Sequence, residues 1–277
     1  MNLNNIFHEI SKFDPEFYEK TSDRRDVIRR WGKGMALAAV PTVLGSLFNK
    51  TYAQGNSGIV DVLNFALTLE YLERDFYQMA LESTGLIPGG APTAAITNIR
   101  EHEAQHVDAL IATIQSLQGT PVDKPTFKFD VGPFSTVFSD YAVFLAVAQA
   151  LEDTGVRAYK GQAGNLMSNN AVLTAALNIH SVEARHASHI RQMRKANGIQ
   201  VKPWITQKIS GITGEAGTTV EPVYEGEQST LQAGVDIADL SGSGVNISVN
   251  AASESFDEPL TKDQVLAVAS LFIVQNP

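Results

Sequence analysis

The sequence predicts an all-α protein built around a four-helix bundle. Apolar residues recur at steps of three and four over four long segments, which is the spacing of amphipathic helices. Turns that contain glycine, proline or asparagine divide these segments into two tight helical hairpins. One long connection joins the hairpins, and this connectivity is known among four-helix bundles.

Each helix follows from its local sequence. In the first, Val62, Phe65 and Leu69 fall on one face, and the pattern ends at Gly85. The segment 119–137 holds three prolines and is expected to be an ordered crossover rather than a helix. The four helices are expected from about 58 to the turn at Gly85, and over about 92–117, 138–166 and 170–197.

The chain divides into an N-terminal segment (1–53), the bundle (54–200) and an extension (201–277). The extension is rich in Gly, Ser, Thr and Asn, and its β-branched runs, such as 245–249, indicate loops with short strands. Thr261-x-x-Gln264 is a capping box that opens an apolar run ending at Val274. This run predicts a terminal helix that docks on the bundle or on a neighbouring subunit, and it is too short to span a bilayer.

The N-terminal segment has the order of an export signal. Basic residues come first, an apolar run follows over 35–48, and Thr51 and Ala53 offer small residues two positions apart. Arg24 and Arg25 lie in a stretch that resembles a twin-arginine signal, although Asp23 stands where Ser or Thr is usual. We expect a periplasmic or otherwise exported protein that meets the membrane only through this segment. The alternative is an amphipathic or membrane-lying helix that stays attached.

Composition excludes several kinds of site. The chain has no cysteine, which excludes disulfides, cysteine-ligated zinc or iron–sulfur sites and a thiol nucleophile. Its net charge is −9, so no basic surface for nucleic acid is expected.

One local sequence occurs twice. Residues 98–106 read NIREHEAQH, and residues 178–186 read NIHSVEARH, with Glu-x-x-His at the same offsets. Each pair is preceded, one helix earlier, by a lone glutamate that follows leucine and precedes a tyrosine by seven positions. The two copies therefore supply Glu70, Glu103, His106 and Tyr77 from one hairpin, and Glu152, Glu183, His186 and Tyr159 from the other.

This pattern predicts a metal site with two ions. Glu and His three positions apart lie on one face of a helix. If those faces point inward, four carboxylates meet in the core, where unpaired charges are costly. Two divalent cations would balance them, and two lone Glu with two Glu-x-x-His are the ligands of di-iron and di-manganese bundles. The predicted ligands are Glu70, Glu103, His106, Glu152, Glu183 and His186, holding two Fe or Mn ions.

Neighbouring polar residues have competing interpretations. Tyr77 and Tyr159 could donate hydrogen bonds to the ligand carboxylates or act as redox-active phenols, but core packing is favoured for both. His102, whose repeat position is Val182, is expected at the surface, as are His180 and His189. Glu73 is expected to be an exposed charge, with extra ligation as the alternative, and Gly155 is expected to permit close helix packing.

Two segments carry a family resemblance. LEDTGVRAYKGQA (151–163) and VEARHASHIR (182–191) resemble exported members of the ferritin-like superfamily that are related to plant desiccation proteins. The resemblance covers about 58–200, with a weaker match at FDEP (256–259). It implies a ferritin-like fold, with Glu70 and Glu152 as lone ligands and Glu103/His106 and Glu183/His186 as paired ligands. It implies little about the reaction.

Two functions follow as hypotheses. The first is a di-metal oxidoreductase that acts on O2 or H2O2, as a ferroxidase or a catalase-like enzyme. The second is a non-enzymatic structural or stress-protective protein whose metal site stabilises the bundle. Iron storage in a shell is less favoured because of the long extension, and rubrerythrin-type electron transfer is excluded in its usual form because its rubredoxin module needs cysteine. A homo-oligomer is also compatible with the extension.

Overall fold

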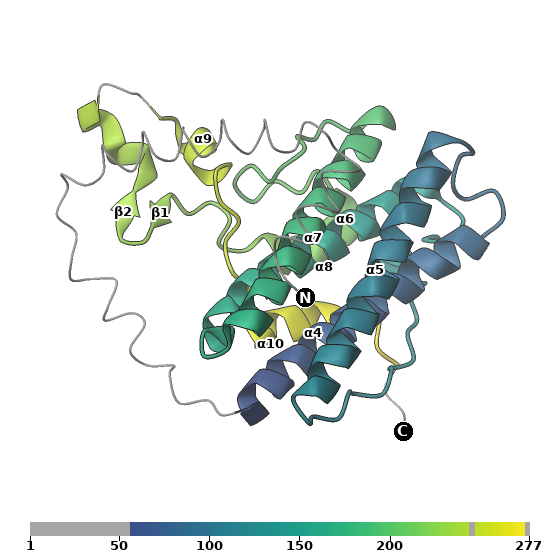
Figure 1. Cartoon of the computed structure of the whole chain (residues 1–277). Coiled ribbons are helices and arrows are strands. Elements are labelled where there is room, and N and C mark those ends of the chain that lie inside the picture. Colours follow the sequence, from purple (N-terminus) through teal and green to yellow (C-terminus); the bar gives the residue numbers. More distant parts are fainter. Residues whose placement is uncertain (1–55, 244–246, 275–277) are drawn as a thin grey trace, which may run out of the picture. The chain divides into compact units, whose positions relative to one another are not determined.

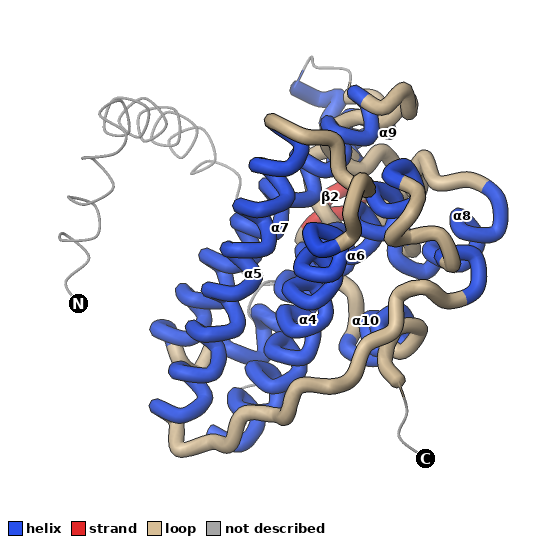
Figure 2. The backbone as a smooth tube through the Cα atoms, turned by 90° about the vertical axis from the view of Figure 1, so that its right-hand side faces the viewer, coloured by secondary structure: helices blue, strands red, loops and turns tan. Residues whose placement is uncertain are grey.

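The bundle predicted from the sequence is confirmed. A computed structural model describes residues 56–243 and 247–274. Four long helices lie side by side, and consecutive helices form two hairpins (Figures 1 and 2). They are α4 (Asn56–Glu82), α5 (Ala91–Ser116), α6 (Tyr141–Ala163) and α7 (Asn170–Ala196). The predicted export signal at 1–53 lies outside the described residues.

Caps set the helix boundaries. The Asp140 side chain accepts hydrogen bonds from the backbone N–H groups of Ala142 (2.8 Å) and Val143 (3.3 Å), so α6 begins at Tyr141 rather than at 138. Asn169 caps α7 in the same way through the Val172 N–H at 3.2 Å. The predicted end of α6 at 166 is occupied by a separate 3-10 turn, Gly164–Leu166.

Aromatic side chains from the helices and the crossover form the centre of the larger apolar cluster. Phe76 is fully buried, and its ring centre lies 5.2 Å from Phe129 of the crossover and 5.3 Å from Phe144 of α6. The crossover contains only one 3-10 turn, η1 (Gly132–Phe134). It is therefore an ordered non-helical connection, as the prolines predict.

The extension folds into short elements. They are α8 (Gly214–Val220), η3 (Glu221–Tyr224), β1 (Leu231–Gln232), β2 (Val235–Asp236), η4 (Ile237–Ser243), α9 (Val249–Ser253) and α10 (Lys262–Ala269). The strands form one antiparallel hairpin. The prediction of a strand near 245–249 is wrong for the described residues of that run. Ser248 caps α9, and Val249 is the first residue of this helix.

The terminal helix is shorter than the sequence predicts. The capping box at Thr261 and Gln264 is present, and α10 packs on α6 of the same chain through buried residues that include Val265 and Val268. The helix ends at Ala269 rather than at Val274, because Ile273 forms a β-bridge with Phe127 of the crossover. Within the residues that the structure describes, no helix has the length and apolar character needed to cross a membrane.

Candidate metal centre

The six residues predicted as ligands meet in the middle of the bundle. Glu70 comes from α4, Glu103 and His106 from α5, Glu152 from α6, and Glu183 and His186 from α7. All four carboxylates are fully buried, and the histidines are 8% and 5% exposed. Each helix therefore turns its polar residues inward among the apolar side chains of the core.

These residues form two overlapping groups that could hold metal ions. One group is Glu70, Glu103, His106 and Glu183, and the other is Glu103, Glu152, Glu183 and His186. Within each group, one potential ligand atom per residue lies within 4.8 Å of the others. Glu103 and Glu183 belong to both groups, so their carboxylates lie where they could bridge two ions.

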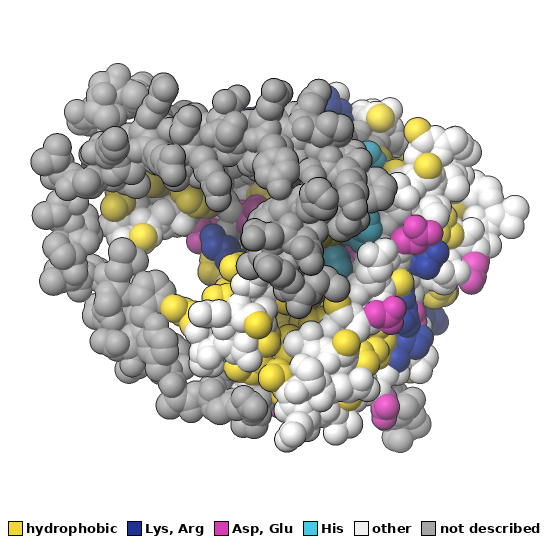
Figure 3. Space-filling view, in the orientation of Figure 1, with side chains coloured by type: hydrophobic (Ala, Val, Ile, Leu, Met, Phe, Trp, Pro, Cys, Tyr) yellow, Lys and Arg dark blue, Asp and Glu magenta, His cyan; other side chains and the backbone are white. Residues whose placement is uncertain are grey.

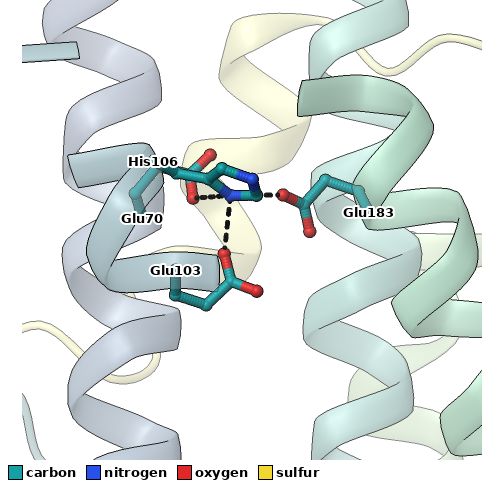
Figure 4. A group of neighbouring side chains, drawn as sticks. All are labelled: Glu70, Glu103, His106 and Glu183. Carbon is teal, nitrogen blue, oxygen red and sulfur yellow. Dashed lines mark hydrogen bonds and ion pairs between the residues drawn. The ribbon is translucent and has the colours of Figure 1, made fainter. Parts of the chain in front are cut away.

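His106 is the centre of the first group (Figure 4). Its Nδ1 lies 3.1 Å from Glu70 Oε2, 2.9 Å from Glu103 Oε2 and 3.0 Å from Glu183 Oε1. Three helices thus direct their side chains toward one small volume. In this arrangement the imidazole is surrounded by carboxylates that would otherwise repel one another.

His186 has the same role in the second group, with an additional partner. Its Nδ1 lies 2.8 Å from Glu103 Oε1 and 3.4 Å from Glu152 Oε2. Its Nε2 lies 2.9 Å from Nδ1 of His102, and the two rings are stacked with their centres 5.2 Å apart. His102 is exposed, as predicted, but it also contacts the buried site.

Several buried atoms of the cluster lack hydrogen-bond partners among the described residues. They are Glu103 Oε1, Glu152 Oε2, both carboxylate oxygens of Glu183, and His186 Nδ1. Buried polar atoms without a partner are rare in folded proteins and need an explanation. Carboxylate and imidazole groups that converge in this way are the ligand types that Fe and Mn prefer, so the residues present match a metal centre.

The surroundings of the cluster shift the pKa values of its groups in opposite directions. Burial raises the pKa of Glu152 to about 7 and that of Glu103 well above its usual value. Although burial opposes it, the adjacent imidazoles of His106 and His186 lower the pKa of Glu183 to about 2. Burial also opposes the charged form of His186, but Glu152, Glu103 and Glu183 raise its pKa to about 12.

The two tyrosines connect the hairpins. Tyr77 of α4 donates a hydrogen bond to Glu152 Oε1 at 2.5 Å, and Tyr159 of α6 donates one to Glu70 Oε1 at 2.5 Å. Each tyrosine therefore contacts the lone glutamate of the other copy of the repeat. Core packing alone, the favoured interpretation, is insufficient, because both hydroxyls lie on predicted ligands.

Glu73 differs most from its sequence-based expectation. The sequence indicates an exposed charge, but the side chain is only 3% exposed and lies beside the cluster. Gly155, expected to serve helix packing, leaves the space next to it: a Cβ on Gly155 would lie 3.2 Å from Glu73 Oε1. The sequence repeat indicates this pairing, because Gly155 occupies the position in the second copy that Glu73 occupies in the first.

The other two histidines lie outside both groups. His180 contacts the backbone carbonyl of Val156, with its Nδ1 at 2.9 Å, and is half-buried. His189 is exposed and lines a groove between α5 and α7. Neither is therefore placed to join the six predicted ligands.

The groove leads from the surface to the cluster. Its volume is about 720 Å³, and its lining includes His102, Arg185, His186 and His189. Figure 3 shows histidine side chains at the surface on the side of the molecule where α5 lies. The sequence gives no indication of such an opening, because the groove depends on how two helices distant in sequence are spaced.

A comparison with protein families shows to which family this chain belongs. A family model described as a ferritin-like domain matches residues 58–196. The chain belongs to the ferritin-like domain family. The ferritin-like match spans nearly all of the four helices and includes all six predicted ligands. A comparison with curated proteins found no match.

Proposed function

We propose that this ferritin-like protein binds two Fe or Mn ions and uses them in redox chemistry on O2 or H2O2, as a ferroxidase or a catalase-like enzyme. The main support is the pair of overlapping groups that share Glu103 and Glu183. Carboxylate and imidazole ligands suit Fe and Mn better than thiophilic metals. Such a pair of ions, when bound, supplies reversible one-electron oxidation and reduction at adjacent positions.

The chain's own residues would hold the ions and control the protons. Glu70 and His106 would hold one ion, Glu152 and His186 the other, and Glu103 and Glu183 would bridge them. Tyr77 and Tyr159 would orient the terminal carboxylates through their hydroxyl hydrogen bonds. Peroxide dismutation is balanced without an organic co-substrate, because one H2O2 is reduced to water while another is oxidised to O2.

Access and location complete the proposal. The groove beside His186 admits small oxidants to an otherwise buried centre. We also propose that the protein is exported through the twin-arginine-like segment and that it assembles as a homo-oligomer. A non-enzymatic protein in which metal only stabilises the bundle is the alternative, and the unpartnered carboxylates would favour metal binding there too.

Metal analysis and oxidant assays on the exported protein test the proposal. We expect about two Fe or Mn ions per chain, with turnover of H2O2 or O2. In Glu103→Ala and Glu183→Ala, metal content, turnover and thermal stability should fall together, with metal affinity lower by about 100-fold. Glu101→Ala, an exposed glutamate on the same helix as Glu103, is the control and should behave as wild type.

Each outcome separates the alternatives. Two metals without turnover would support the structural function. Absence of bound metal after Fe(II) or Mn(II) is offered would contradict both functions. Unchanged metal content and melting temperature in Glu103→Ala and Glu183→Ala would show that the site assignment is wrong.

A further inference from the structure

Glu73 is a buried carboxylate that the six-residue metal site does not explain. Its side chain is 3% exposed, and it makes no hydrogen bond or ion pair with any of the described residues. A buried carboxylate without a partner is strongly unfavourable unless it is protonated or binds a cation. Beside four other carboxylates, the Glu73 carboxyl therefore either keeps a proton or shares a bound cation with its neighbours.

The space around Glu73 connects it to the cluster. A Cβ placed on Gly155 would lie 3.2 Å from Glu73 Oε1 and 3.6 Å from Glu183 Oε2, so both carboxylates border the same point. Glu183 is common to both metal-binding groups, whereas Glu73 borders them without belonging to either. Burial first, and then Glu183 and Glu152, raise the pKa of Glu73 well above its usual value, which also places it within the field of the cluster.

Apolar walls close the other side of Glu73. A cavity of about 10 Å³ beside it, the size of a single water molecule, is bordered by α4, α6 and α10. Val268 and Ala269 of α10 are part of this wall. The carboxylate therefore has little contact with solvent and lies next to the candidate metal centre.

The repeat shows that this feature is specific to one half of the bundle. Glu152 follows Glu70 by 82 positions (152 − 70), and Gly155 follows Glu73 by the same interval (155 − 73). A helical glycine costs about 1 kcal/mol relative to alanine. At this position it leaves room for the glutamate of the other copy.

We propose that Glu73 is a fifth carboxylate of the metal centre, a seventh protein ligand that binds a divalent Fe or Mn ion beside Glu183 in the space left by Gly155. This inference rests on the proposed function, because it assumes that the centre binds metal. It makes the two halves of the centre unequal, although their other ligands are repeated in sequence.

Titration of the metal-free full-length protein with Mn(II), followed by calorimetry, tests the inference. Wild type should bind two ions, and Glu73→Gln should bind one of them about 10- to 100-fold more weakly. Gly155→Ala should also weaken the binding of that ion, because the added methyl group displaces the Glu73 carboxylate. Glu82→Gln, an exposed glutamate on the same helix, is the matched control and should bind as wild type.

Two further measurements separate ligation from structural support. Substitution by Gln keeps the shape of the side chain, so the metal-free melting temperature should not fall, while the increase caused by Mn(II) should shrink. With Co(II) as a spectroscopic probe, the visible absorption bands of Glu73→Gln should differ from those of wild type, because a ligand is lost.

The possible outcomes separate a failure of this inference from a failure of the proposed function on which it rests. Two ions bound with equal affinity by wild type and Glu73→Gln, with identical Co(II) spectra, would overturn the role of Glu73 and leave the proposed function intact. A wild-type protein that binds no Mn(II) would overturn both.

Discussion

At the scale of single residues, the two halves of the centre have the same ligand types in different surroundings. His186 has His102 on its Nε2, whereas the position equivalent to His102 in the other copy is Val182. A partner on the second ring nitrogen fixes the tautomer and orientation of a ligating histidine. His102 therefore prepares Nδ1 of His186 to face the carboxylates.

This contact predicts the effect of His102→Val, a substitution that places at position 102 the valine found at the equivalent position, 182. One of the two ions should bind about 10-fold more weakly, because His186 loses the group that orients it. Since His102 is exposed, the metal-free stability should change by no more than about 0.5 kcal/mol. Calorimetric titration with Mn(II) measures the first quantity and urea unfolding the second.

His189→Val is the matched control for His102→Val. His189 is also exposed and lines the same groove, but it lies outside both metal-binding groups. Its metal affinity should equal that of wild type. Equal affinities in all three proteins would show that His102 does not orient His186.

At the scale of elements, α6 is one of the bundle helices that hold the extension in place. Arg157 is fully buried, its Nε lies 2.8 Å from Glu227 Oε1, and it donates a hydrogen bond to the Glu258 backbone carbonyl at 2.7 Å. Its guanidinium also donates to the backbone carbonyl of Val223. One side chain of α6 thus fixes two segments of the extension.

Arg157→Met is expected to lower the free energy of unfolding by about 3–5 kcal/mol, because it leaves Glu227 buried without its counter-charge. Urea unfolding followed by circular dichroism measures the loss. The double variant Arg157→Met/Glu227→Leu should recover part of it, since the uncompensated carboxylate is then absent. A double variant that is no more stable than the single one would show that the hydrogen bonds to backbone carbonyls dominate.

The helices were predictable from sequence because their signals are local. Periodicity and caps fix their positions, and the duplicated Glu-x-x-His identifies residues that the bundle brings together. The early end of α10 was not predictable, because it depends on the pairing of Ile273 with Phe127 across the fold. The burial of Glu73 was missed for the same reason, since its neighbours come from α6 and α10.

At the scale of the whole described unit, the candidate metal centre has a closed side and an open side. On the side of α4 and α6, α10 covers the bundle, and its Val268 and Ala269 border the cavity beside Glu73. Between α5 and α7 the groove reaches His186. Small molecules and ions are therefore expected to enter between α5 and α7, while the other side excludes water.

The metal-free protein should become less stable as the pH rises from about 5 to about 8. Glu152 has a pKa of about 7 when folded and 4.5 ordinarily, so the folded state retains a proton that the unfolded state has released. His186, with a pKa of about 12 against 6.5 ordinarily, has the same effect above its ordinary pKa. The lowered pKa of Glu183, about 2, stabilises the fold throughout this range and is lost only at lower pH.

Bound metal should reverse this trend, because ions replace the protons of the cluster and bind more tightly as those protons leave. The increase in melting temperature caused by Mn(II) should therefore be larger at about pH 8 than at about pH 6. Differential scanning calorimetry of both forms across this range measures the two slopes. In Glu152→Gln the metal-free slope should be shallower, since one titrating group is gone. A metal-free melting temperature that rises over this range would show that protons do not balance the buried carboxylates.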